Sequence, residues 1–472
     1  MRFPLHRIQL QWPNVARRIS LGLLVCVLWA TGHPRVFASQ PSPDLKSGKA
    51  AYDQSCSRCH GDAGHGDGVD AKRFYPRPRD VSLGVYKFRS TASGTPPSDA
   101  DLFETITRGL PGSNMPDWAH LDEAVRWQLV YYLKSLSSKF QETPPSPVDV
   151  APDPGPKGAD VAKGKALYVQ LGCAACHGAQ GRANGTSAAG LVDDWGMPIR
   201  PANLTQGWSY RGGNDPRSIM LRVLAGIDGA GMPSYAGALS PADAWPLAYY
   251  VSSLQEPTHW NMIAHASWID GPLPTSLDDP RWASVESTDV RVRNAVNPSG
   301  EWVAPPTVTS VRLQVVYNHE TVAFRFSWDD PSHSVQSLPD SLALVLRPVG
   351  VPGDVVTLQD WPYNGAPRLD FCYWSAEADT TTELLSSDMD TVLTRRGSHT
   401  TLVNTSTYTD GRWSVVLQRP LKPASPAGAA VLAPEASTSV AVMVWDGGNP
   451  NVRAISPWID VVLGHGRAET KK

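Results

Sequence analysis

Two short stretches of this sequence place cysteine and histidine at a spacing that fits haem chemistry. They read Cys56-Ser-Arg-Cys59-His60 and Cys173-Ala-Ala-Cys176-His177. Two thiols three positions apart can form thioethers with the two vinyl groups of one haem, and the adjacent histidine then lies under the iron. Because the pattern occurs twice, we predict two covalently bound haem c groups. The predicted attachment residues are Cys56, Cys59, Cys173 and Cys176, and the predicted proximal iron ligands are His60 and His177.

Each of these histidines has a methionine at the same distance further along the chain. Met115 follows His60 by 55 positions, and Met232 follows His177 by 55 positions. Both methionines precede a proline in a glycine-containing loop, and glycine lets a backbone come close to the haem edge. We therefore predict Met115 and Met232 as the sixth ligands of the two irons.

Three other side chains compete for the sixth position. Met197 follows the second haem motif closely, and no methionine stands at the corresponding place after the first motif. His65 and His120 follow the first motif, and no histidines correspond to them after the second. Methionine is also a common core residue, but the equal spacing in two copies favours ligation. A His/Met pair raises the reduction potential and fills both axial positions. The pattern therefore favours electron transfer over catalysis.

An internal repeat positions these residues, over roughly residues 41–140 and 157–256. After each haem motif, Arg77-Pro78-Arg79 in the first copy corresponds to Arg200-Pro201-Ala202 in the second. Each copy closes with apolar residues at helical spacing. A proline-rich stretch at 141–158 separates the copies, and it predicts an extended linker.

Together these features resemble two tandem class I cytochrome c domains. The matching parts of each copy are an N-terminal helix, C-x-x-C-H, the methionine loop and a C-terminal helix. The resemblance implies two small, mainly α domains at residues 41–140 and 159–256, each wrapped around its haem.

After about residue 270 the pattern changes to short runs that alternate apolar and polar residues. The strand candidates are residues 311–317, 321–328, 341–346, 369–374, 400–403, 413–417 and 439–445. Turn signals such as Asp410-Gly411 separate them. Seven or so short strands predict a β-sandwich. The predicted fold class is therefore multidomain, with two mainly α cytochrome c domains followed by an all-β sandwich at 268–465.

The sandwich region resembles the haem-b-binding γ subunit of ethylbenzene dehydrogenase and related subunits of the type II dimethyl sulfoxide reductase family. That family includes nitrate reductases and nitrite oxidoreductases. The resemblance rests on segments such as Asp279-Pro280-Arg281-Trp282 and Phe324-Arg325-Phe326-Ser327-Trp328. It implies iron–sulfur and molybdopterin subunits of a periplasmic oxidoreductase as partners. Electrons would pass between that complex and a soluble or membrane cytochrome.

The same resemblance implies a haem b held between Met and Lys, but this sequence departs from that pattern. Asn364 stands in the Met position, and residues 404–407 contain no Lys. Substitute ligands that do not fit the pattern are Met389, His399, Met443 and Lys422. Two alternatives stay open, a third haem of the b type or a sandwich without haem that serves as a docking module.

The N-terminus has the features of an export signal. A positively charged start precedes the short apolar run 19–30, and Val36-Phe37-Ala38 fits a cleavage site. We predict a signal peptide at 1–38 and a periplasmic location, with an uncleaved anchor as the alternative. Of the two cysteines outside the haem motifs, Cys26 lies in this leader and Cys372 is predicted to be buried in a strand. The net charge of −3 does not indicate a basic surface for binding nucleic acid.

We consider three functions. The first is a subunit that transfers electrons and is not itself an enzyme. In the second, the sandwich binds a carbohydrate or another surface ligand. Exposed tryptophans on a concave face would favour this function, and buried tryptophans would count against it. The third is a dihaem peroxidase, which requires an open or switchable haem and is disfavoured by two methionine loops.

Overall fold

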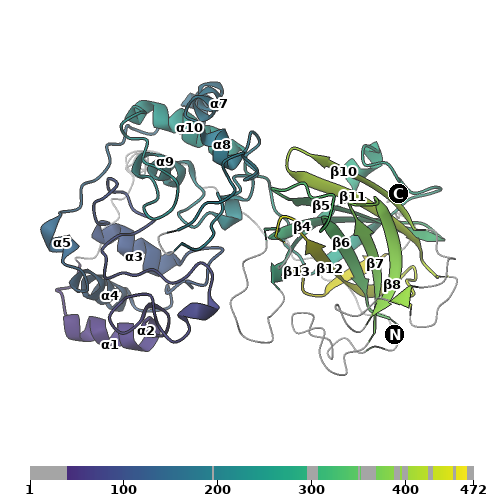
Figure 1. Ribbon diagram of the computed structural model, residues 1–472, viewed down its shortest axis with the longest axis horizontal. Coiled ribbons are helices and arrows are strands. Elements are labelled where there is room, and N and C mark those ends of the chain that lie inside the picture. The colour runs from purple at the N-terminus through teal and green to yellow at the C-terminus, as the bar shows by residue number, and fades with distance from the viewer. Residues whose placement is uncertain are drawn as a thin grey trace, which may run out of the picture. The chain divides into compact units, whose positions relative to one another are not determined.

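The computed structural model of the chain describes residues 40–193, 196–294, 307–348, 351, 368–386, 394–395, 402–423, 429–449 and 453–464. Helices occupy the first half of the sequence and strands the second (Figure 1). The predicted signal peptide at 1–38 lies outside the described residues. Among the residues that are described, no helix is both long enough and apolar enough to cross a membrane.

Four helices occur in the same order in both copies of the repeat. The first copy contains α1 (Leu45–Ser55), α2 (Ser57–His60), α3 (Asp99–Arg108) and α4 (Glu123–Ser135). The second contains α7 (Val161–Gln170), α8 (Cys173–His177), α9 (Pro216–Ala225) and α10 (Pro241–Ser253). Helix α1 packs on α4, and α7 packs on α10 in the same way. Each copy therefore encloses a hydrophobic core of its own.

The segment predicted as an extended linker lies against both helical domains. It begins in the single-turn helix α5 (Lys139–Glu142) and ends with the single-turn helix α6 (Gly155–Gly158). The amide of Ala92 donates to the carbonyl of Ser146 at 2.7 Å. Further along, Val148 packs against the core of the second domain, and Trp245 donates from Nε1 to the carbonyl of Ala151 at 2.8 Å. These contacts fasten the segment to the surface of each domain in turn.

The described residues of the second half of the chain form a 14-stranded sheet. Its strands are β1 (Ile263–Trp268), β2 (Ser287–Arg291), β3 (Arg293–Asn294), β4 (Ser310–Tyr317), β5 (Thr321–Asp329), β6 (Ser341–Leu346), β7 (Leu369–Ser375), β8 (Thr380–Ser386), β9 (Thr394–Arg395), β10 (Val403–Thr409), β11 (Arg412–Pro420), β12 (Ser437–Trp445), β13 (Arg453–Ile455) and β14 (Ile459–Leu463). The main order is β10-β11-β5-β4-β1-β14-β12-β6-β7-β8-β9. Strand β1 is parallel to both β4 and β14, and it joins the two halves of the sheet.

Apolar side chains from both halves of the sheet meet in one large core. Its members include Trp328 on β5, Trp374 on β7 and Trp413 on β11. Cys372 is fully buried on β7, as its sequence context predicted. The core explains why the alternating runs of the sequence form strands, because each run buries one face against the opposite half. The prediction of a β-sandwich after two α-helical domains is confirmed.

Candidate haem-binding sites

The two predicted proximal histidines are held in the same way. His60 ends α2, and its Nδ1 lies 3.0 Å from the carbonyl oxygen of Arg79. His177 ends α8, and its Nδ1 lies 2.9 Å from the carbonyl oxygen of Ala202. A carbonyl can only accept, so Nδ1 carries the proton and Nε2 keeps its lone pair for a metal. Burial lowers the pKa of both imidazoles and so favours the neutral form that binds iron.

The turn that ends each motif is also fixed by a repeated contact. Tyr52 on α1 donates its hydroxyl to the carbonyl of Gly61 at 2.7 Å, and Tyr168 on α7 donates to the carbonyl of Gly178 at 2.7 Å. The two glycines have φ values of 78° and 79°, where a residue with a Cβ would be strained. A buried tyrosine on the first long helix of each domain thus holds the backbone next to the histidine.

Met115 and Met232 lie in loops with the same hydrogen bonds. The amide of Leu110 donates to the carbonyl of Met115 at 3.1 Å, and the amide of Ile227 donates to the carbonyl of Met232 at 3.0 Å. Both methionine side chains are half-buried. Met232 and Cys173 pack against the same core cluster. In the second domain, a predicted attachment residue and the predicted sixth ligand therefore share one hydrophobic core.

The residues around the first motif fit a haem group. Cys56 and Cys59 are free thiols, and burial raises the pKa of Cys56 to about 12, so it is uncharged. The hydroxyl of Tyr86 and Nε1 of Trp118 are buried donors without a hydrogen-bond partner among the described residues. Both side chains pack with Cys56 against the core of this domain. A haem c needs two free thiols for attachment and a histidine with an available Nε2, and its carboxylate groups need hydrogen-bond donors. The residues around the first motif provide all of these groups.

The second motif has the same chemical character. Cys173 and Cys176 are free thiols, and burial raises the pKa of Cys173 to about 11. The competing Met197 is half-buried in a loop in which its amide donates to the Asp193 carboxylate at 3.0 Å. Of the competitors in the first unit, His120 is exposed, and His65 lies 3.0 Å from the Ser82 hydroxyl.

The first helical domain contacts the methionine loop of the second. Arg79, whose carbonyl holds His60, donates from Nη2 to the carbonyl of Asp228 at 3.0 Å. Asp228 lies four residues before Met232, and its carboxylate pairs with Arg89 at 2.8 Å. The side chain of Arg89 is completely buried and that of Asp228 is 16% exposed, so water screens this ion pair only weakly. The segment that holds His60 is thereby joined to the loop that contains Met232.

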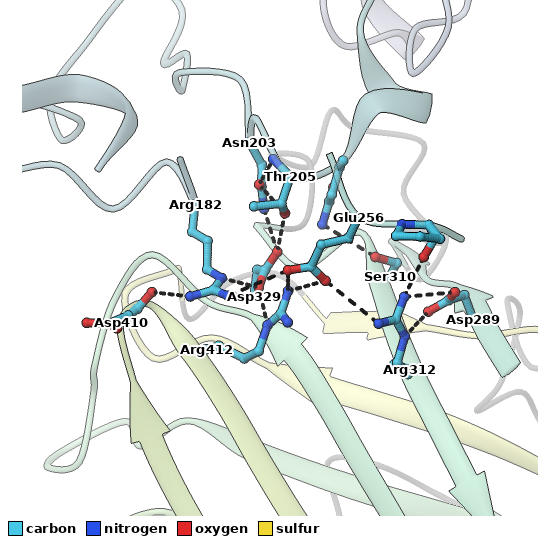
Figure 2. Close-up of polar contacts among 12 residues, drawn as sticks. Arg182, Asn203, Thr205, Glu256, Asp289, Ser310, Arg312, Asp329, Asp410 and Arg412 are labelled. Carbon is cyan, nitrogen blue, oxygen red and sulfur yellow. Dashed lines mark hydrogen bonds and ion pairs between the residues drawn. The ribbon is translucent and has the colours of Figure 1, made fainter. Parts of the chain in front are cut away.

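The second helical domain also contacts the sandwich, through the loops that follow its haem motif (Figure 2). Asn203 is the residue after Ala202, and it donates from Nδ2 to the carboxylate of Asp329 at 2.8 Å. Arg182 pairs with Asp329 at 3.2 Å and donates to the carbonyl of Asp410 at 3.1 Å. The backbone that holds His177 is therefore one residue away from a contact with the sandwich.

Asp329, at the end of β5, is the centre of a buried charge network. Its carboxylate lies 2.7 Å from Nε of Arg412, which also pairs with Glu256 at 2.9 Å (Figure 2). Burial would raise the pKa of Asp329, but Arg412 and Arg182 outweigh burial and hold it below its usual range. The network therefore consists of charged groups, and removing one partner would leave another charge buried and unpaired.

Sequence reasoning predicted the candidate iron ligands but did not identify Arg79, Asn203, Asp228 and Asp329 as residues of their surroundings. One signal was present for the two carbonyls that bond the histidines. The repeat aligns Arg79 with Ala202, and these are the residues whose carbonyls hold the histidines. The partners Asp228 and Asp329 have no such signal, because each contact joins segments more than a hundred residues apart.

The residues considered for a third haem are only partly described. Asn364, Met389 and His399 lie outside the described residues. Met443 is fully buried on β12 among other core side chains, and Lys422 is exposed after β11. The two described positions, Met443 and Lys422, therefore do not support a pair of haem ligands.

Both helical domains match known protein families. Residues 43–133 match the family described as cytochrome c oxidase, cbb3-type, subunit III, and residues 161–255 match the family described as cytochrome c. The first half of the chain therefore consists of two cytochrome c domains, as predicted, which implies covalently bound haem c. The haem-b-binding γ-subunit likeness of the sandwich has no counterpart in these matches.

Curated relatives match less than half of the chain. Subunit CcoP of the cbb3-type cytochrome c oxidase from Azospirillum sp. (strain B510) is 32% identical over 223 residues, which is 44% of this chain and 62% of the relative. CcoP from Azospirillum brasilense is 27% identical over 216 residues, again 44% of this chain and 62% of the relative. The chain thus spans less than two thirds of the length of these relatives.

Some solved structures resemble a part of the chain. A chain of the Kuenenia stuttgartiensis reducing HAO-like protein complex Kustc0457/Kustc0458 is 41% identical, with a TM-score of 0.44, over 46% of this chain and 100% of that chain. A family 9 carbohydrate binding module from Caldicellulosiruptor kristjanssonii, in complex with glucose, is 10% identical with a TM-score of 0.28, over 44% of this chain and 97% of that chain.

Proposed function

We propose that this chain is a dihaem electron-transfer subunit of a larger oxidoreductase complex. Cys56 and Cys59 attach one haem, which His60 and Met115 ligate. In the second site, the attachment residues are Cys173 and Cys176, and the ligands are His177 and Met232. The observation that carries this proposal is the duplicate hydrogen bond from a proximal histidine Nδ1 to a loop carbonyl, at 3.0 Å and 2.9 Å.

The residues around each site have defined roles in this function. The carbonyls of Arg79 and Ala202 fix the orientation of the imidazoles and increase their basicity. The methionine loops supply a sulfur ligand, which raises the reduction potential and fills the last coordination position of the iron. A bound haem c supplies the one-electron chemistry. With both axial positions filled, the sites pass electrons and do not bind a small-molecule substrate.

The contacts between domains arrange the sites in series. Asp329 of the sandwich binds the loop that holds His177, and the methionine loop of the second site binds Arg79 beside the first site. An electron accepted near the sandwich would therefore reach the second haem before the first. The sandwich serves as the docking domain in this arrangement.

The partner class follows from the likeness of the sandwich to γ subunits of molybdenum enzymes. We propose an iron–sulfur and a molybdopterin subunit of a periplasmic oxidoreductase on one side of the relay. On the other side we propose a soluble or membrane cytochrome. Export to the periplasm by the N-terminal leader fits this placement, because covalent haem attachment is completed there.

A carbohydrate-binding sandwich is the second candidate, and one cavity favours it. Half-buried Tyr373 and Trp445 line a pocket together with Phe371. The large tryptophans Trp282 and Trp328 are buried and cannot stack on a sugar. We rank this function below docking. The peroxidase hypothesis ranks lower still, because both domains carry the methionine loop.

Purification of the full chain from its native host tests the proposal. We expect two covalent haems by pyridine haemochrome analysis, together with molybdenum and iron–sulfur subunits identified by mass spectrometry. Two haems without a molybdenum subunit would overturn the partner assignment and leave the cytochrome function intact. Fewer than two covalent haems would contradict the function itself.

A further inference from the structure

Three buried aspartates meet at one end of the sandwich. Asp330 follows β5, Asp340 precedes β6 and Asp446 follows β12. The pairing of Ser341 with Trp445 brings the last two together, and β5 brings the first from the other half of the sheet. Carboxylate oxygens of all three lie within 4.8 Å of one another. Asp330 and Asp340 are completely buried, and Asp446 is 4% exposed.

The hydrogen bonds of this cluster leave two oxygens unpaired. Oδ1 of Asp330 accepts from the amide of Ser332 at 3.0 Å, and Oδ1 of Asp446 accepts from the amide of Gly448 at 2.7 Å. Oδ2 of Asp330 and Oδ2 of Asp446 are both buried and have no hydrogen-bond partner among the described residues. A buried carboxylate oxygen without a partner is costly, so its persistence calls for a ligand.

The cluster also has no balancing positive charge. In the described part of the chain, no lysine or arginine forms an ion pair with any of the three carboxylates. The neighbouring Asp329 differs, since it pairs with Arg412 at 2.7 Å and with Arg182 at 3.2 Å. Burial, followed by repulsion from Asp446 and Asp340, raises the pKa of Asp330 well above its ordinary value. Three adjacent buried carboxylates repel one another when ionised, so a bound cation would stabilise them.

We propose that Asp330, Asp340 and Asp446 bind a calcium ion. Calcium prefers carboxylate and carbonyl oxygens and accepts irregular geometry. The three residues offer no nitrogen or sulfur, which disfavours zinc. Magnesium keeps several of its waters and needs near-ideal octahedral geometry, which a site this buried does not favour.

The ion would connect the two halves of the sandwich next to the cytochrome contact. Asp340 also accepts a hydrogen bond from Nε1 of Trp413 at 2.9 Å, and Trp413 follows Arg412 on β11. Asp330 directly follows Asp329, the last residue of β5, and β5 pairs with β11. Strand β5 thus leads into one residue of the proposed calcium site and carries Asp329 of the charge network, and β11 contacts both through Trp413 and Arg412. Calcium would stabilise that docking surface.

Calorimetry and metal analysis of the full-length holoprotein test this site. We expect one calcium per chain by elemental analysis. We also expect the sandwich transition to rise by roughly 5–10 °C at a calcium concentration about a hundred times the Kd, relative to EDTA. Magnesium at the same concentration should have a much smaller effect. Equal unfolding temperatures in calcium and EDTA, or an equal rise with magnesium, would overturn the proposal.

Substitutions separate a metal site from a cluster that merely shares protons. Asp330→Asn and Asp446→Asn should abolish the calcium response. In EDTA, Asp330→Asn should unfold at a higher temperature than the wild type, because asparagine has no charge that must be buried or neutralised on folding. The control Asp460→Asn, at an exposed position on β14, should keep the full response. A calcium response retained in both cluster variants would overturn the assignment. Should the variants fail to fold, the wild-type comparison decides alone.

Discussion

At the scale of single residues, the two haem sites depend on how the histidines are oriented. Each Nδ1 is tied to a backbone carbonyl, so the ring cannot turn its other nitrogen away from the iron position. Because a main-chain atom is the acceptor, substitution of the side chains of Arg79 or Ala202 leaves the acceptor in place. The methionines are the residues whose replacement should report on electron transfer most directly.

We expect Met232→His to lower the reduction potential of the second haem and leave covalent attachment unchanged. A histidine in place of the thioether stabilises the ferric state relative to the ferrous state. The measurement is a spectroscopic redox titration of the purified holoprotein. Met197→Leu is the matched control, and it should change neither potential. An unchanged potential in Met232→His would remove Met232 as a ligand.

At this scale the sequence predicted the motif residues but not their charged surroundings. The haem motifs and the equal spacing of Met115 and Met232 are local or periodic features, which a sequence displays directly. Asp329 and Asp330 are adjacent in sequence, yet one pairs with arginines and the other faces two carboxylates. The two environments differ because neighbouring residues at the end of β5 contact different parts of the fold.

At the scale of elements, each cytochrome domain depends on a close crossing of its first and last helices. A Cβ at Gly48 would lie 2.4 Å from the carbonyl oxygen of Gln128, and a Cβ at Gly164 would lie 2.0 Å from that of Pro246. The absence of a side chain lets α1 approach α4 and lets α7 approach α10. This crossing also positions the tyrosines that hold the haem motif.

Gly164→Ala should therefore destabilise the second domain by about 1–3 kcal/mol through overpacking. Alanine favours a helix over glycine by about 1 kcal/mol, so the steric cost must exceed this gain. The measurement is urea unfolding monitored by the Soret band. Gly237→Ala is the control, since a Cβ there has no neighbour within 4 Å. A Gly164→Ala variant as stable as the wild type would refute the close crossing.

Strand prediction succeeded where apolar periodicity is strong and failed elsewhere. Strands β4, β5, β6, β7, β11 and β12 coincide with predicted runs. Strand β10 begins at Val403, where the predicted 400–403 run ends, because its side chains are mostly polar and it forms through pairing with β11. Strand β1 was missed since it is short, partly exposed and parallel to β14, nearly two hundred residues away.

At the scale of the whole molecule, the polar contacts connect the sandwich to the second haem site and the second site to the first. The buried Arg89–Asp228 pair and the Asp329 network are the two junctions. Neither junction could be predicted from the sequence, because long-range ion pairs leave no local pattern. The proposed order of the relay therefore rests on the fold, whereas the prediction of two haem sites rests on the repeat.

The most direct test of the relay is a redox titration of the full-length holoprotein followed through its visible spectrum. We predict two one-electron transitions from two low-spin haems, each with the weak methionine–iron band near the red end of the ferric spectrum. A single transition, or a high-spin ferric haem that turns over peroxide, would contradict the account.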